Sequence, residues 1–255
     1  MTGLDDAQLD HLTGAVEALL EEPWQQPKGR RRSLTIRQAV IIACGYARQN
    51  IVEEVWAEIF EVSQATVSKT ITLLTPLIAK VTEDCRPTAE QARSAIRGNS
   101  ALLDGFLAPC WSWHDRPDLW SGKHKTTGFN SQLVATVTGE VVFVSDPLPG
   151  RTHDSKAAAE ADTASVLAAA FSTVADKGYQ GRGFITPIKK PLHRGLVDSE
   201  IKYNNQVSGV RAPVERAISH LKAWRILHTD YRRPLRTYAD SFKAAVGLYF
   251  FKLAF

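Results

Sequence analysis

The stretch Ser172–Gly181, STVADKGYQG, constrains the chain most, because a short apolar run there ends in an acid followed by glycines. The apolar residues before Asp176 suit the interior of a strand. Gly178 and Gly181 let the backbone turn sharply just after the acid. The sequence therefore predicts a buried strand that ends in a carboxylate at the edge of a sheet.

Two further acids stand in comparable settings. An apolar run ends in Asp104 and a glycine in ALLDG, which predicts a second strand end, and Glu215 follows Pro213, a residue favoured in a first helical turn. Two strand-end aspartates and one helical glutamate suit a divalent metal ion that keeps positions open for phosphate. The alternative for either aspartate is a turn residue whose side chain bonds the nearby backbone.

Two cations accompany Glu215. Arg211 lies four residues before it and Lys222 seven after it, so a helix places all three on one face. The face is either a surface ladder of ion pairs or a metal ligand beside two phosphate-binding groups.

Composition limits the class of protein. The 255 residues are 44% hydrophobic and 23% charged, as in ordinary globular proteins, and the net charge of +4 leans weakly towards an anionic partner. The three cysteines, Cys44, Cys85 and Cys110, are widely spaced, so neither a disulfide framework nor a zinc site is indicated and a cytoplasmic location is expected. No secretory signal or membrane span is predicted.

The first third of the chain predicts helices. Apolar spacing indicates a helix over 5–21, and a basic cluster with Arg30, Arg31 and Arg32 follows, which suits either a DNA backbone or a solubilising linker. Thr35 with Gln38 predicts a capped helix to Gln49. A second helix is expected over 52–60, with an inner face of Val52, Val55, Trp56, Ile59 and Phe60. Ser63 is expected to cap a third helix, whose inner face is Val67, Ile71, Leu74 and Ile78.

The second and third of these helices suit a helix-turn-helix. Gln64, Ser68 and Lys69 lie on the outer face of the third helix, where side chains would contact a DNA groove. Pro76 is expected to kink or shorten that helix. A three-helix bundle with no DNA contact is the alternative.

The remaining two thirds predict a mixed α/β fold. The ranges 129–138 and 140–145 indicate a hairpin beside the Asp104 strand, and 184–188 indicates a further strand. Helices are expected over 156–171 and 198–225. A final apolar stripe from Leu235 to Leu253 predicts a C-terminal helix that packs on the sheet or on another subunit.

Several polar residues are secondary candidates. Asp154 is expected to cap a helix first and to assist the site second, together with His153. Lys189 and Lys190 lie in a basic loop that either holds DNA or is simply solvated. Trp111, Trp113 and Trp120 stand near Lys123, His124 and Lys125; at least two of the tryptophans are expected in a core or interface, and DNA stacking is the alternative.

Four of these segments together resemble a known family. LLDG at Asp104, PGRTHDSK at 149–156, ADKGYQG at Asp176 and VERAISHLK at Glu215 are similar to the DDE transposases, in the insertion-sequence and Harbinger-type branch. The resemblance implies a ribonuclease-H-like mixed sheet with flanking helices over 96–255. It also implies an all-α helix-turn-helix domain over 34–85, after an N-terminal helix and basic linker over 1–33.

The resemblance also implies an activity. Asp104, Asp176 and Glu215 would bind two Mg²⁺ ions, with Mn²⁺ able to substitute, while Arg211 and Lys222 would hold phosphates. The enzyme would cleave the terminal inverted repeats of its element and join them to target DNA, as a homodimer or larger synaptic complex, associated with the nucleoid if bacterial. The alternatives are a catalytically inactive, transposase-derived DNA-binding regulator and a nuclease without strand transfer.

Overall fold

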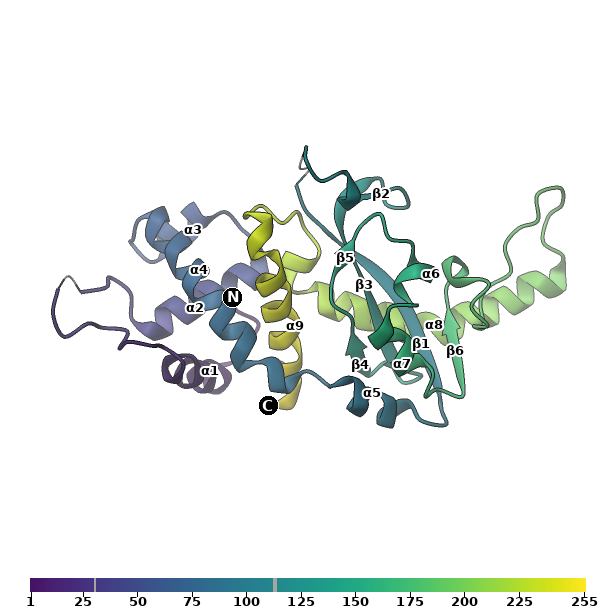
Figure 1. Ribbon diagram of the computed structural model, residues 1–255, viewed down its shortest axis with the longest axis horizontal. Helices are drawn as coiled ribbons and strands as arrows, with labels where there is room; N and C mark the ends of the chain where they lie inside the picture. The colour runs from purple at the N-terminus through teal and green to yellow at the C-terminus, as the bar shows by residue number, and fades with distance from the viewer. Residues whose placement is uncertain (30, 112–113) are drawn as a thin grey trace. The chain divides into compact units, whose positions relative to one another are not determined.

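A computed structural model describes residues 1–29, 31–111 and 114–255 (Figure 1). Contacts divide the chain into two compact units: Met1–Arg86 with Lys222–Phe255, and Pro87–Leu221. The division differs from the predicted domain over 96–255, because the segment after Leu221 belongs with the N-terminal helices.

The first unit is built from helices. Thr35 caps α2 as predicted: its side chain accepts from the Gln38 amide, and the Gln38 side chain accepts from the Thr35 amide. Ser63 caps α4, whose predicted inner residues are all buried, and Pro76 lies inside α4 without ending it. The helices are α1 (Asp6–Ala18), α2 (Ile36–Gln49), α3 (Glu53–Ile59), α4 (Gln64–Val81) and α9 (Tyr238–Ala254).

The packing of two helices in this unit was not predicted. Val52, Val55 and Ile59 are between 42% and 49% exposed, so the predicted inner face at α3 is wrong and of this apolar set only Trp56 is fully buried. The C-terminal helix α9 packs on α4 and α2 of its own unit, and its predicted contact with another subunit stays a prediction. An amphipathic stripe shows that a helix is covered but does not identify what covers it.

The second unit contains a mixed sheet, as predicted. Its order is β2-β3-β1-β6, with β4 and β5 also paired to β3; β1 runs antiparallel to β3 and parallel to β6. The strands are β1 (Ser100–Pro109), β2 (Trp120–Ser121), β3 (Thr126–Thr136), β4 (Val141–Val144), β5 (Leu148–Pro149) and β6 (Ser172–Ala175). The helices are α5 (Ala89–Ile96), α6 (Asp154–Ala157), α7 (Ala161–Leu167) and α8 (Asp198–Lys222).

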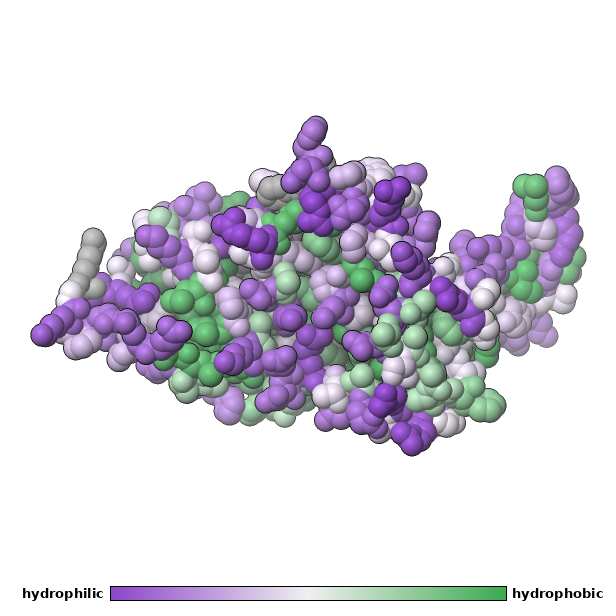
Figure 2. All heavy atoms as spheres, viewed as in Figure 1, coloured by the Kyte–Doolittle hydropathy of each residue, from purple (hydrophilic) through white to green (hydrophobic). Residues whose placement is uncertain are grey.

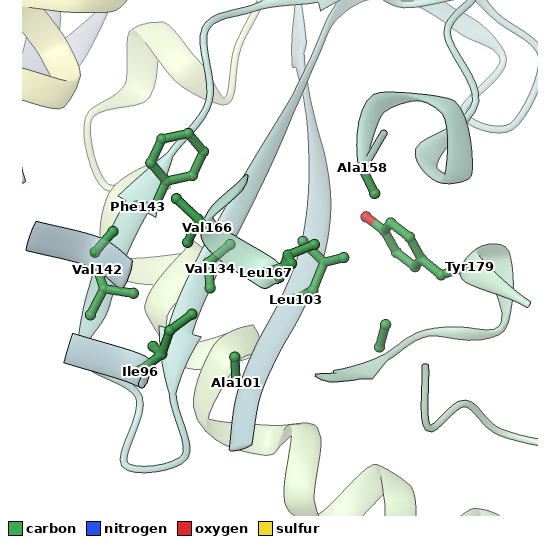
Figure 3. Packing of buried hydrophobic residues seen from close by; sticks show 12 residues of the cluster. Ile96, Ala101, Leu103, Val134, Val142, Phe143, Ala158, Val166, Leu167 and Tyr179 are labelled. Carbon is green, nitrogen blue, oxygen red and sulfur yellow. The ribbon is translucent and has the colours of Figure 1, made fainter. Parts of the chain in front are cut away.

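Helices cover this sheet around one apolar core. Residues of α5, α7 and the strands form the cluster in Figure 3, which includes Ile96, Leu103, Val134 and Val166. The predicted hairpin is present as β3 and β4, where Gly139 takes a positive φ of 93° and lies against Pro213 of α8.

Three details of this unit differ from prediction. The range 184–188 makes only a single bridge, between Ile185 and Val174 of β6, because the next donor position of a parallel ladder is Pro187, which has no N–H. The alanine-rich segment is divided into α6 and α7. Pro213 lies within α8, so Glu215 does not begin a helix.

No helix among the described residues is long and apolar enough to cross a membrane.

Candidate active site

The parallel pairing of β1 and β6 brings Asp104 and Asp176 together. Leu103 pairs with Ala175, so the acids that follow them occupy equivalent positions on neighbouring strands. Side chains alternate along extended backbone, and Leu103 and Ala175 both face the α5 and α7 core, so the two carboxylates leave the opposite face. Asp176 follows its strand as predicted, whereas Asp104 lies in the middle of β1, which continues to Pro109 because β3 pairs with it throughout.

Helix α8 supplies the third acid and a cation. Its buried stripe includes Arg211, whose Nη2 donates to Asp104 Oδ2 at 2.8 Å. The same guanidinium lies 3.5 Å from Glu215, so it bridges two of the three predicted acids. Arg211 therefore contacts carboxylates here, and its predicted role as a phosphate-binding group stays a prediction.

Burial dominates the electrostatics of Asp104. It raises the pKa of Asp104 from 3.8 to about 6, with Arg211 opposing the rise and the nearby Asp176 adding to it. The side chain of Asp104 is only 15% exposed, whereas that of Glu215 is 58% exposed. The site thus combines one sheltered carboxylate with one open to solvent.

Asp154 is a further carboxylate of this site. His153 occupies the N-cap position of α6 and makes no side-chain cap, and Asp154 turns instead towards the sheet, so its predicted capping role is wrong. The Asp154 side chain is 8% exposed and accepts from Lys123 Nζ at 2.5 Å and from Asn130 Nδ2 at 3.0 Å. Burial lowers the pKa of Lys123, but Asp154, Asp176 and Asp104 together outweigh burial and raise it above its ordinary value.

A chain of buried hydrogen bonds joins Asp154 to the Asp176 turn. The Tyr179 hydroxyl donates to Gln132 Oε1 at 2.6 Å, and Gln132 donates to Asn130, which donates to Asp154. Tyr179 lies three residues after Asp176, so the two acids are linked through one polar network. Neither Tyr179 nor the two β3 amides was predicted as a site residue; the available signal was a pair of amides two residues apart, which strand geometry places on one face.

Glycines let these groups approach the strand. A Cβ on Gly105 would lie 2.9 Å from both Asp154 Oδ1 and the Tyr179 hydroxyl. A Cβ on Gly178 would lie 2.7 Å from Asp176 Oδ1 and 3.4 Å from Asp154 Oδ2. Gly105 and Gly178 therefore leave the space that the Asp154 carboxylate occupies, next to β1 and next to the Asp176 turn.

The donor chemistry fits a hard cation. Mg²⁺ prefers oxygen ligands and is commonly held by one or two carboxylates, with waters and substrate phosphates completing its shell. Within the described ranges, no three His, Cys, Asp or Glu side chains converge closely enough to bind a metal together as they stand. Asp104 and Asp176, at equivalent strand positions, are ligands of the type that such a site uses. Arg211 contacts Asp104, and Lys123 contacts Asp154.

The site lies inside a region shared with known proteins. Residues 103–249, more than half of the chain, match the family described as DDE superfamily endonuclease. The chain belongs to this family. All three acids that the sequence predicted fall within the matched region of this DDE superfamily endonuclease.

Two curated relatives are similar over most of their length. One, from Streptomyces albus G, is described as a transposase for insertion sequence element IS112 and is 29% identical over 202 residues, covering 78% of this chain and 74% of the relative. Another, from Microchaete diplosiphon, is described as a transposase for insertion sequence element IS702 and is 24% identical over 265 residues, covering 100% and 93%. No solved structure matches this DDE superfamily endonuclease.

Most of the remaining predicted site residues lie at the surface of their units. Lys189, Lys190 and His153 are exposed, and Lys222 is the last residue of α8. In the first unit, Lys69 is exposed, Ser68 is half-buried and Gln64 donates to Glu53 at 2.5 Å. Arg30 and Trp113 lie outside the described residues. Trp111 and Trp120 are 53% and 49% exposed, so neither lies in the core of this unit, and their predicted place in an interface stays a prediction.

Proposed function

We propose that this chain is a transposase that cleaves DNA at the ends of its own element and joins the freed 3′ ends to target DNA. The observation that carries the proposal is the placement of Asp104 and Asp176 at equivalent positions of adjacent strands, within the region matched by the DDE superfamily endonucleases. The descriptions of the two relatives as transposases support the same substrate class.

The proposed site would hold Mg²⁺, or Mn²⁺ in its place, through Asp104, Asp176 and Glu215. Two such ions activate a water or a 3′-hydroxyl for attack and stabilise the leaving oxygen of an in-line displacement. Arg211 orients the Asp104 carboxylate by a hydrogen bond and brings α8, with Glu215, to the sheet. The network from Tyr179 to Asp154 fixes the turn that follows Asp176.

The DNA would be bound outside this site as well. We assign the helix-turn-helix role to α3 and α4, with Gln64, Ser68 and Lys69 towards the groove. Contacts with the DNA backbone are assigned to the basic linker, to Lys189 and Lys190, and to Lys222. The partners would be the terminal inverted repeats and target DNA, with at least a homodimer in the synaptic complex, as expected for an element with two ends.

A plasmid assay tests the proposal. The substrate carries the DNA that flanks the coding sequence on both sides, and the full-length protein is supplied with Mg²⁺ or Mn²⁺. Asp104→Asn, Asp176→Asn and Glu215→Gln should each lower cleavage by about 10²-fold or more while retaining DNA binding. Asp162→Asn, an exposed acid of α7, is the matched control and should cleave at the wild-type rate.

The products distinguish the alternatives. Joined product supports a transposase, and cleavage without joining indicates a nuclease that lacks strand transfer. Binding without cleavage in either metal would show a DNA-binding regulator, and cleavage retained in the Asp104 variant would contradict the assignment of the site.

A further inference from the structure

A basic cavity lies in the first unit, between the linker that follows α1 and the first turns of α4. Its volume is about 360 Å³. Arg31 and Arg32 of the linker line it together with Lys69 of α4, and Ser63 and Thr66 add hydroxyl groups. None of the described residues that line it is acidic. Two segments separated in the sequence therefore supply cations to the same space.

The linker is held in place by its own contacts. Trp24 is 4% exposed, and its Nε1 donates to the Leu34 carbonyl at 2.8 Å. The Arg32 guanidinium lies 4.3 Å from the centre of the Trp24 ring, and Gln25 bonds both the amide and the carbonyl of Arg32. The cations on this side of the cavity are thus positioned before any ligand binds.

The cations of the cavity are not neutralised by acids. Among the described contacts, Arg31, Arg32 and Lys69 form no ion pair with a carboxylate, whereas Arg37 nearby in sequence is bound by both Asp6 and Asp10. All three cavity cations are exposed, and the linker surface is hydrophilic at the left of Figure 2. A cluster of uncompensated cations with hydroxyl donors is suited to an anion.

We propose that this cavity binds a backbone phosphate of duplex DNA, and the proposal rests on the DNA-binding function proposed above. Lys69 then contacts the backbone together with Arg31, which replaces the groove contact assigned to it above and leaves Gln64 and Ser68 for the groove. A phosphate held at the start of α4 fixes the position of that helix on the duplex, and phosphate contacts of this kind set register without reading sequence. The helix N-terminus adds a favourable dipole to the cations.

Salt dependence of DNA binding tests the proposal. Affinity is measured by fluorescence anisotropy on two duplexes of unrelated sequence over a series of chloride concentrations. The Arg31→Gln/Lys69→Gln variant loses the contact with this one phosphate and should reduce the slope of log affinity against log salt by about 1, equally on both duplexes. Lys80→Gln/Lys243→Gln removes the same charge from exposed positions of α4 and α9 outside the cavity and should leave the slope unchanged.

Several results would overturn the proposal. One is an unchanged salt slope in the cavity variant, and another is an equal reduction of the slope in the control variant. A third is a reduction seen on only one duplex, which would indicate that the residues contact bases. Protection of the wild type against heat by inorganic phosphate at matched ionic strength, with the DNA slope unaffected by the cavity substitutions, would show a small-anion site only. Circular dichroism melting verifies that both variants fold, and Arg31→Lys/Lys69→Arg should restore the slope if charge is what matters.

Failure here is separable from failure of the proposed function. If the cavity substitutions reduce the salt slope of DNA binding but the wild-type protein never cleaves DNA, the phosphate-binding proposal holds and the transposase proposal fails. If cleavage depends on Asp104, Asp176 and Glu215 while the cavity substitutions leave the salt slope unchanged, the transposase proposal holds and the phosphate-binding proposal fails.

Discussion

Replacing Arg211 with methionine tests the electrostatic account of the site. The side chains of Arg211 and Asp104 are 10% and 15% exposed and are joined at 2.8 Å. Methionine keeps the apolar stem but leaves the Asp104 carboxylate buried without its partner, which costs about 3–5 kcal/mol of unfolding free energy for a buried pair. Arg216→Met, an exposed arginine of the same helix, is the control and should cost no more than about 0.5 kcal/mol.

The cost should depend on pH in a defined direction. The folded-state pKa of Asp104, at about 6, is above its ordinary value of 3.8, so stability falls as pH rises between these values. Arg211 lowers this pKa, so its removal raises the pKa further. At about pH 5 the Asp104 carboxyl of the variant is then protonated and uncharged, so most of the loss of unfolding free energy disappears. At about pH 8 the carboxyl is charged and the full loss applies.

Hydrogen exchange of β1 measures this effect locally. Peptides from Ser100–Pro109 report opening of the second unit, and comparison with wild type at the same pH cancels the intrinsic exchange rate. An equal loss of protection at both pH values would refute the reasoning, because it would mean that packing, not charge, is what Arg211 contributes.

Three further substitutions test packing and polar contacts. Tyr179→Phe leaves the buried Gln132 oxygen without its donor and should cost about 1–3 kcal/mol in guanidinium unfolding. Arg233→Met leaves Glu53, 13% exposed, without its cation and with only Gln64 as a side-chain donor, and should lower stability by about 3–5 kcal/mol; an unchanged melting temperature would contradict the pairing. Gly45→Ala adds a methyl that overlaps the buried indole ring beside it and should cost about 1–3 kcal/mol, whereas Ala at the open position Gly14 should not destabilise.

Local signals in the sequence predicted local structure well. Thr35 and Gln38 satisfy each other's backbone within one helical turn, so the start of α2 was predictable from neighbouring residues alone. The strand before Asp176 and the β3–β4 hairpin follow from composition and turn glycines in the same way. Asp104 was misplaced along its strand because the length of β1 is set by its pairing with β3, which its own residues do not encode.

Long-range pairing decided what the sequence left open at the site. The approach of Asp104 to Asp176 depends on a parallel register between strands about seventy residues apart, and the contact of Lys123 with Asp154 depends on where β2 and α6 meet. A pattern of single residues cannot specify such distances. The family resemblance selected Asp104 and Asp176, which the register places at equivalent positions of neighbouring strands, whereas the role of Glu215 stays a prediction.

Metal binding tests the central claim most directly. Mn²⁺ is titrated into the full-length protein and followed by electron paramagnetic resonance, which detects the ion whether or not cleavage occurs. If Asp104 and Asp176 form one metal centre, Asp104→Asn and Asp176→Asn should each weaken Mn²⁺ binding by about 10-fold or more, and Asp162→Asn should not. Wild-type Mn²⁺ affinity in either of the two site variants would contradict the claim.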